Sequence, residues 1–174
     1  MNQAVATSRN GKATNRLVFN LESRKFRLGD ELALLDVFLS SIRDIASRDY
    51  TPQQIAAWAS DDINPKDWAH LVKTLNPFIV EINGFIAGYA DVQSNGYIDH
   101  FYVSGDYPKQ GVGTLLMRCI HNEANILGLH KLTANVSKTA EPFFIRQGFH
   151  VVERGFPIRR GVGLPNALMY KTLM

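Results

Sequence analysis

Residues 109–114, Lys-Gln-Gly-Val-Gly-Thr, have the composition of a phosphate-binding turn. The first backbone N–H groups of a helix lack partners within the helix and carry the positive end of its dipole. Glycine lets a phosphate reach them without a Cβ in the way. The segment is therefore a candidate pyrophosphate cradle, with a glycine-rich turn into a packing helix as the structural alternative. A dinucleotide fingerprint would need glycine at position 116, which is leucine, and a Walker loop would need Lys-Ser/Thr where Thr114-Leu115 stands.

The cradle stands between a predicted strand and a predicted helix. Residues 97–103 are rich in aromatic and β-branched types and are followed by the breakers Gly105, Asp106 and Pro108. From Gly111 to a C-cap at Gly128, apolar residues recur at the spacing of an amphipathic helix. The residues of this predicted apolar face are Val112, Leu115, Leu116, Cys119, Ile120 and Leu127.

Two segments together resemble a known family. The pattern strand-Val103-x₇-Gly111-x-Gly113-helix resembles the acetyl-CoA motif of the GNAT superfamily of N-acetyltransferases. Residues 137–149, SKTAEPFFIRQGF, resemble the family's Asn-x-x-Ala-x-x-Phe-Tyr-x-x-x-Gly-Phe segment. The resemblance is best over about residues 78–150, and residues 50–59 are similar to a bacterial YafP-like subgroup.

The resemblance implies the GNAT fold, an α/β (α+β) arrangement with a mixed, mostly antiparallel central sheet flanked by helices. It implies transfer of an acetyl group from acetyl-CoA, the acyl-donor cosubstrate, to a primary amine of a small molecule or protein. Backbone groups of Phe101 and Val103 are expected to pair with the pantetheine arm, and Ser137 stands where many members carry Asn. The residues expected to contact the cofactor are Phe101, Tyr102, Val103, Lys109, Gln110, Gly111, Val112, Gly113, Thr114, Ser137, Ala140, Phe143 and Phe144.

Amine acetylation also needs a base, and the expected base is Asp99. Strict alternation puts Tyr97, Asp99, Phe101 and Val103 on one face of the predicted strand, where Asp99 is the one carboxylate. Family members with a base on this strand place Glu or His at the positions matching Tyr97 and Asp99, so both are expected catalytic residues. Asp99 would act directly or through water, and a structural aspartate bonded to a nearby turn is the alternative.

The sequence departs from the family at two positions. Pro108 replaces the usual Gln or Arg, which removes a side-chain contact and an N–H donor, and Lys109 could offset the lost charge. Phe144 replaces a tyrosine that is often the acid for the leaving thiolate. Tyr50, Tyr97 and Tyr170 are unranked substitutes for it, and solvent is a further option. A catalytically silent acyl-CoA-binding regulatory module is therefore the alternative function.

The remaining elements must position this chemistry. In the family the first two helices flank the acceptor site, so Tyr50 and Trp58 are candidate substrate contacts, with core aromatics as the alternative. One helix is expected from Asp30, with an apolar stripe of Leu32, Leu35, Phe38 or Leu39, Ile42 and Ile45. A second starts at the capping box Thr51-Pro52-Gln53-Gln54, and Asp67 should cap a third through Leu75.

The strands follow from hairpin and helix signals. The first is expected within residues 17–27, with its best part at 25–27. Asn83-Gly84 should join residues 78–82 and 85–92, with 97–103 as the next antiparallel strand. Residues 132–136 should have a parallel neighbour, because they follow a strand and a helix. A short helix at 140–148, a final strand pair at 149–157 and 167–173, and a loop at Gly161-Val162-Gly163 complete the expectation.

Composition fits one globular domain over residues 17–174, after a tail at 1–16 that is expected to be disordered. Of 174 residues, 45% are apolar and 20% charged; the net charge of +3 suits an anionic cofactor, and without a Lys/Arg run nucleic acid is not an expected partner. Cys119 is expected to be a buried thiol, and the five histidines lack metal-binding spacing, so no metal is expected. We expect a cytoplasmic protein without membrane contact. The amine acceptor is not identified, and a homodimer is left open.

Overall fold

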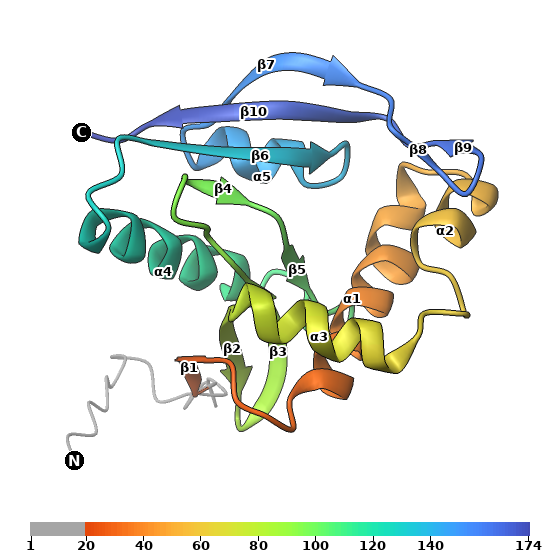
Figure 1. Ribbon diagram of the computed structural model, residues 1–174, viewed down its shortest axis with the longest axis horizontal. Coiled ribbons are helices and arrows are strands. Elements are labelled where there is room, and N and C mark those ends of the chain that lie inside the picture. Colours follow the sequence, from red (N-terminus) through yellow and green to blue (C-terminus); the bar gives the residue numbers. More distant parts are fainter. Residues whose placement is uncertain (1–19) are drawn as a thin grey trace, which may run out of the picture.

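In the computed structural model, which describes residues 20–174, two four-stranded half-sheets meet where one stretch of chain crosses between them (Figure 1). The first half-sheet has the order β1 (Leu21–Lys25), β2 (Phe78–Ile82), β3 (Phe85–Ala90) and β5 (Phe101–Val103). The second has the order β4 (Tyr97–Ile98), β6 (Lys131–Ser137), β10 (Asn166–Thr172) and β7 (His150–Gly155). Only the β4–β6 pair is parallel among these described strands, which confirms the mixed, mostly antiparallel sheet.

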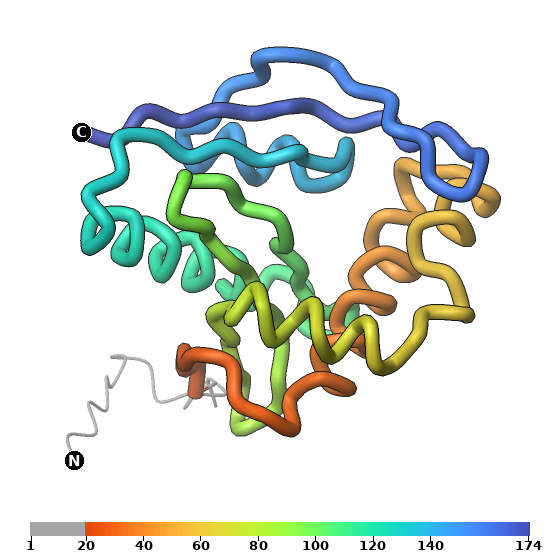
Figure 2. Tube along the Cα trace, in the orientation of Figure 1, coloured from red at the N-terminus to blue at the C-terminus, as the bar shows by residue number. Residues whose placement is uncertain are grey.

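The crossing point corrects the single strand predicted for residues 97–103. β4 pairs with β6, β5 pairs with β3, and Asp99 and His100 lie between them in neither ladder. Figure 2 shows the green trace leaving β6 and bending toward β3 at this point. The break shifts the alternation, so Ile98 packs in the same core cluster as Phe101, on the opposite side from Tyr102. Because a two-residue break resets the phase of a strand, Ile98 does not lie on the face opposite Phe101, as the alternation predicted.

Helix α4 (Val112–Ile126) packs against β2, β3 and β5 and forms one wall of the main core. The helix predicted from Gly111 to Gly128 is confirmed, and Gly128 ends it with a φ of 64°. The buried face is Val112, Leu116, Met117, Ile120 and Ala124. Two residues of the predicted apolar face are not buried: Leu127 lies beyond the last turn and is exposed, and Cys119 is half-buried. The buried face is therefore rotated by part of a turn from the predicted one.

The opposite face of the first half-sheet is covered by α1 (Glu31–Ser40) and α3 (Pro65–Leu75). Helix α1 continues as a π-helical turn (Ser41–Ile45) and a 3-10 turn (Ala46–Arg48), before α2 (Pro52–Trp58). The Thr51–Gln54 capping box of α2 is confirmed. Asp30 is the N-cap residue of α1 as predicted, but its side chain makes no capping bond because Arg24 and the Arg27 N–H bind its carboxylate. The cap predicted for α3 is wrong, since Asn64 caps that helix instead of Asp67.

The predicted stripe of α1 is also wrong in one turn. Leu32 is 67% exposed, and the buried positions are Leu34, Val37 and Phe38. At the start of the helix the buried residue is Leu34, where the prediction had Leu32 and Leu35. It rejoins the core at Phe38 and Ile42, which hold the helix against β3.

The last third of the chain builds the second half-sheet. The parallel partner predicted for residues 132–136 is β4, and α5 (Glu141–Arg146) and the β7–β10 pair fall where expected. The predicted loop at Gly161-Val162-Gly163 is instead part of a small hairpin, β8 (Ile158–Arg159) and β9 (Val162–Gly163), which contacts α2. Arg160 and Gly161 form its tip with φ values of 49° and 76°.

The tail predicted at residues 1–16 and the first residues of the 17–27 strand prediction lie outside the described residues. Within residues 20–174, no helix is both long and apolar enough to cross a membrane. The described part of the chain also contains no group of three His, Cys, Asp or Glu residues that could hold a metal ion.

Candidate active site

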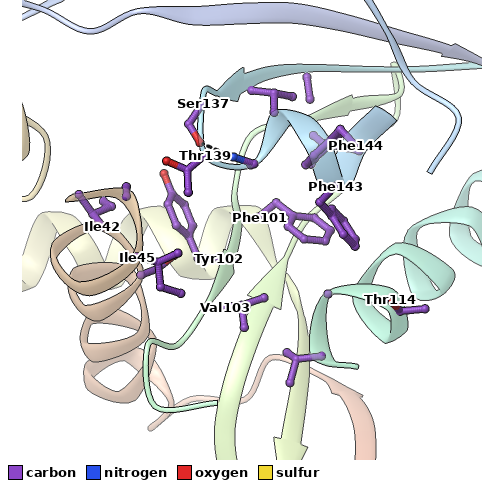
Figure 3. A pocket seen from close by; sticks show the side chains of 18 of the residues that line it. Ile42, Ile45, Phe101, Tyr102, Val103, Thr114, Ser137, Thr139, Phe143 and Phe144 are labelled. Atoms are coloured by element: carbon purple, nitrogen blue, oxygen red, sulfur yellow. Dashed lines mark hydrogen bonds between the residues drawn. The ribbon is translucent and has the colours of Figure 1, made fainter. Parts of the chain in front are cut away.

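A cleft of about 520 Å³ opens where β5 and β6 diverge, and we call it the β5–β6 cleft. Its walls are β5, the start of α4, the end of β6 with the loop that follows it, and α5 (Figure 3). Ser41, Ile42 and Ile45 of the π-helical turn close one side. All thirteen residues expected to contact the cofactor line this one cleft: Phe101, Tyr102, Val103, Lys109, Gln110, Gly111, Val112, Gly113, Thr114, Ser137, Ala140, Phe143 and Phe144.

The first turn of α4 presents free donors to the cleft. Gly111 is the N-cap residue, in a left-handed conformation with a φ of 85°, and it provides no side-chain cap. Lys109 also has a positive φ, 58°, so the turn alternates between left-handed and other backbone conformations. Such a turn aims successive N–H groups toward one point, which is the geometry of an anion-binding nest. The arrangement fits the predicted pyrophosphate cradle.

Gly113 has a role that the sequence did not reveal. A Cβ on this residue would lie 3.3 Å from Cζ of Phe143 and 3.7 Å from Cε1 of Phe101. The two phenyl rings lie 5.5 Å apart, and each also contacts Phe144. Glycine at position 113 therefore lets the helix start approach an aromatic wall of the cleft. Phe144 is only 2% exposed, so its ring belongs to the core behind that wall.

Strand β5 presents unused backbone groups to the cleft. On either side of β5, Asp91 N–H donates to His100 C=O at 3.1 Å, and Ser104 N–H donates to Ala87 C=O at 2.8 Å. The even-numbered positions of residues 100–104 therefore turn their backbone groups toward β3 and its ends. In an antiparallel ladder the intervening residues point their N–H and C=O groups the other way. The backbone groups of Phe101 and Val103 therefore face the gap toward β6, where a bound chain could pair with them.

Two polar side chains in the cleft have unmatched atoms. Thr139 Oγ1 and Gln110 Oε1 are buried and have no hydrogen-bond partner within residues 20–174. Ser137 Oγ accepts a hydrogen bond from Ala140 N–H at 3.2 Å, which leaves its own proton free to donate. Thr139 was missed by sequence reasoning, although a hydroxyl directly before the 140–148 helix prediction was a usable signal. Buried polar atoms without partners favour a bound polar ligand at this place.

A second cavity, of about 600 Å³, adjoins the cleft, and we name it the Tyr97 cavity. The cleft and this cavity share Trp58, Asp99, Tyr102, Asn135 and Ser137. Asp99 is exposed at this junction, so its carboxylate can meet a group that enters from either side. The predicted base therefore lies at the opening between two cavities.

The predicted substrate contacts Tyr50 and Trp58 both line the Tyr97 cavity. Tyr50 is 6% exposed, and its hydroxyl donates to Pro165 C=O at 2.5 Å and accepts from Lys138 N–H at 3.0 Å. Burial raises the pKa of Tyr50. Both hydrogen-bonding directions are already used, so this hydroxyl joins the segment before α2 to the chain after β6 and before β10. Only the ring remains to contact a ligand. The Trp58 ring packs on it at 5.3 Å.

The two other candidate acids differ in position. Tyr97 lies in the Tyr97 cavity, and its hydroxyl accepts a hydrogen bond from the Asn135 amide at 3.2 Å, so its own proton is available. Tyr170 packs against His150 at 5.4 Å and does not line the cleft or the Tyr97 cavity. Tyr102 points across the cleft toward the loop that carries Ser137 and Thr139 (Figure 3). Burial raises the pKa of Tyr102 to about 12, which makes it a hydrogen-bond donor and a weak acid.

A third cavity, about 630 Å³, lies beyond Trp58 and Tyr102 between α3 and the β8–β9 hairpin, and we name it the Trp68 cavity. His100 lines it, and its ring stacks on Phe38 and also packs against Trp68 and Tyr102. Burial lowers the pKa of His100 to about 4, and its Nδ1 lies 3.0 Å from the Tyr89 hydroxyl. A neutral imidazole in this position accepts or donates hydrogen bonds without adding charge.

Comparison with known proteins gives the same family at three levels. The model of the acetyltransferase (GNAT) domain matches residues 46–169. The uncharacterized N-acetyltransferase YafP of Escherichia coli is 31% identical over 150 residues, which cover 86% of this chain and 95% of that protein.

Two solved structures share the fold. A GCN5-related N-acetyltransferase from Rhodopseudomonas palustris superposes with a TM-score of 0.83 at 28% identity, over 87% of this chain and 95% of that chain. The PaiA N-acetyltransferase from Thermoplasma acidophilum, solved in complex with coenzyme A, gives a TM-score of 0.70 at 14% identity, over 88% and 99%.

Proposed function

We propose that this chain, which belongs to the GNAT family of acetyltransferases and transfers an acetyl group from acetyl-CoA to an amine, binds acetyl-CoA in the β5–β6 cleft. The observation that carries the proposal is the cleft itself, because one cavity collects free N–H groups, unmatched side-chain oxygens and an aromatic wall. The PaiA structure, which has the same fold and was solved in complex with coenzyme A, supports coenzyme A as the kind of ligand.

Each wall has a separate task in the proposal. The first turn of α4 would hold the pyrophosphate by backbone N–H groups, with Lys109 adding positive charge. The backbone groups of Phe101 and Val103 would pair with the pantetheine arm. Gln110 and Thr139, whose buried oxygens have no partner in the described structure, would hydrogen-bond to the bound cofactor. Bound acetyl-CoA supplies the activated acetyl group.

Asp99 would accept the proton of the attacking amine, directly or through water. Its position supports this, since it is exposed at the junction where the Tyr97 cavity meets the cleft. Tyr97 stands in the same cavity with a free hydroxyl proton, so it is the tyrosine of the three candidates that best fits the role of an acid. Phe144 would exclude water from the cofactor end of the cleft.

The direct test is a calorimetric titration with coenzyme A, in the presence and absence of amines. Saturable binding at one site per chain supports the proposal, and a rise in melting temperature should accompany it by linkage. Absence of binding would contradict it. The cytoplasmic location, the absence of a metal and of nucleic-acid or membrane partners, and the homodimer stay predictions from the sequence.

A further inference from the structure

The acceptor side of the site contains an arginine whose charge is not used within the protein. Arg159 of β8 lines both the Tyr97 cavity and the Trp68 cavity. Its neighbour Arg160 pairs with Asp62 at 3.1 Å, and Arg43 pairs with Asp61 at 2.6 Å. Within residues 20–174, Arg159 has neither an ion pair nor a hydrogen bond to a carboxylate. Its guanidinium donors are therefore all available to a ligand.

The hairpin that carries Arg159 is attached to the rest of the site. Gln54 Nε2 of α2 donates to Gly163 C=O at 2.9 Å, and the Tyr50 hydroxyl donates to Pro165 C=O just beyond β9. Leu164 N–H closes the base of the hairpin on Pro157 C=O at 2.9 Å. The backbone that presents Arg159 is thus held to α2, beside the two cavities that Arg159 lines.

Two opposite charges act on the same junction. Burial dominates the pKa shifts of His100 and Tyr102. In addition, the positive charge of Arg159 acts to lower both pKa values, and the negative charge of Asp99 acts to raise them. Both charges therefore lie near these two side chains, one at the opening to the cleft and one on the hairpin. Between them, the Tyr97 cavity is walled by the aromatic rings of Tyr50, Trp58, Tyr97, Tyr102 and Phe156.

We infer that Arg159 selects the acceptor by binding a carboxylate of a small amine whose amino group meets the acetyl donor beside Asp99. A planar guanidinium binds a carboxylate through two parallel hydrogen bonds, whereas it repels a second ammonium group. The aromatic walls favour an acceptor with an apolar or aromatic body. The acceptor class is therefore an amino acid or a similar amino carboxylate, and simple amines and polyamines are poor substrates. This inference rests on the proposed donor site in the β5–β6 cleft.

The test compares matched pairs of amines that differ in the carboxylate: phenylalanine with phenethylamine, tryptophan with tryptamine, and 4-aminobutyrate with butylamine. With saturating acetyl-CoA, kcat/KM is measured by thiol release and by mass spectrometry of the product. The wild type should favour the carboxylate member of at least one pair. Arg159→Ala should raise KM for that member by about 10- to 100-fold, the range for a lost charge-assisted hydrogen bond, and should not raise KM for the paired amine that lacks the carboxylate.

Arg160→Ala is the matched control, since it removes the same charge one residue away and should keep the preference. Arg159→Lys should retain part of the preference for carboxylates, because lysine keeps the positive charge but lacks the planar guanidinium that makes two parallel hydrogen bonds. A wild type that acetylates the plain amines as well as the carboxylates would overturn the inference and leave the proposed function intact. So would equal losses in Arg159→Ala and Arg160→Ala.

A second measurement does not depend on turnover. Binding of the amino carboxylates to the coenzyme A-loaded protein is followed by calorimetry in the wild type and in Arg159→Ala. Weaker binding in the variant supports the inference, and equal binding contradicts it. Failure of coenzyme A itself to bind would instead contradict the donor site, so the two ideas fail in different experiments.

Discussion

The Asp91 carboxylate accepts a hydrogen bond from the backbone N–H of His100 at 2.6 Å. The same oxygen also accepts from Asp99 N–H at 3.1 Å. These two N–H groups belong to the break between β4 and β5, where neither strand ladder can use them. A carboxylate that is 1% exposed therefore takes the place of a neighbouring strand and lets β5 part from β6. The β5–β6 cleft exists because of this parting.

Asp91 should make the protein less stable as pH rises. Burial raises the pKa of Asp91 to about 6, although the hydrogen bonds from the His100 and Asp99 N–H groups act to lower it. The second carboxylate oxygen has no hydrogen-bond partner within residues 20–174. Because the pKa of Asp91 is higher in the folded than in the unfolded protein, its protonated form favours the folded state. This contribution to stability is complete below about pH 4 and is lost as the pH rises to about 6. The loss from this group is about 3 kcal/mol. Chemical denaturation at several pH values measures it.

Asp91→Asn keeps an oxygen for the two N–H groups and removes the titration. Its free energy of unfolding relative to the wild type should therefore rise between pH 4 and pH 6. Asp106→Asn, a change of the same kind at an exposed turn, should leave the pH dependence as it is. Parallel pH profiles for the wild type and Asp91→Asn would show that Asp91 does not titrate in this range.

Gly113→Val should weaken coenzyme A binding strongly. The added methyl groups would enter the space now bounded by Phe143 and Phe101, 3.3 and 3.7 Å from the Cβ position. Displacement of this aromatic wall would narrow the cleft beside the N–H groups of α4. Calorimetric titration with coenzyme A should show at least a tenfold loss of affinity, which corresponds to about 1.4 kcal/mol.

Asn122→Ala is the control for Gly113→Val, because it lies on the exposed face of the same helix. It should bind coenzyme A as the wild type does. Melting temperatures of both variants separate a loss of binding from a loss of folding. If folded Gly113→Val keeps wild-type affinity, coenzyme A is held elsewhere.

Asp99→Asn should lower kcat by roughly 10²-fold or more, the usual contribution of a positioned base. Coenzyme A affinity should change little, because the carboxylate lies at the junction of the cavities and away from the α4 cradle. The measurement is kcat as a function of pH, together with the affinity for coenzyme A. Glu153→Gln removes another carboxylate from the Tyr97 cavity and should have a small effect. An Asp99→Asn enzyme with the wild-type kcat and pH profile would leave Asp99 with a structural role.

Phe144→Tyr should be neutral or slower than the wild type. The ring is 2% exposed and packs on Phe101, Phe143 and Phe149. A hydroxyl placed there without a partner costs about 1–3 kcal/mol of stability, and Tyr97 or solvent can protonate the thiolate without it. Melting temperature and kcat for the same amine give both effects. A large gain in kcat at unchanged KM would mean that a missing acid limits the reaction.

The elements fixed by local sequence signals were predictable. The Asn83-Gly84 hairpin, the Thr51–Gln54 capping box and the α4 helix between Gly111 and Gly128 each follow from residues a few positions apart. The cleft was predictable as a list of residues, because the two family-like segments that build it, residues 97–114 and 137–149, are continuous in the chain. Their roles as ligands stay predictions.

The features that sequence reasoning missed depend on contacts between distant residues. Nothing near residue 99 indicates that Asp91 will bind the N–H groups of the strand break. The sequence prediction therefore treated residues 97–103 as one continuous strand and continued the alternation of faces across the break. Asp30 has the type of an N-cap residue, but a bond from Arg24 uses its carboxylate. Arg159 is one of two adjacent arginines, and only the position of Asp62 decides which of them is free.

Product formation distinguishes an acetyltransferase from a silent acyl-CoA-binding module. The purified protein is incubated with acetyl-CoA and the amine panel, and free thiol and acetylated amine are quantified in the same samples, with Gly113→Val alongside. We predict that thiol and acetylated amine appear in equal amounts, that the rate saturates in both substrates, and that Gly113→Val lowers the rate at acetyl-CoA concentrations below saturation of the variant. Tight coenzyme A binding without acetylated amine above the enzyme-free background would contradict this account, and it would identify the chain as a silent acyl-CoA-binding module.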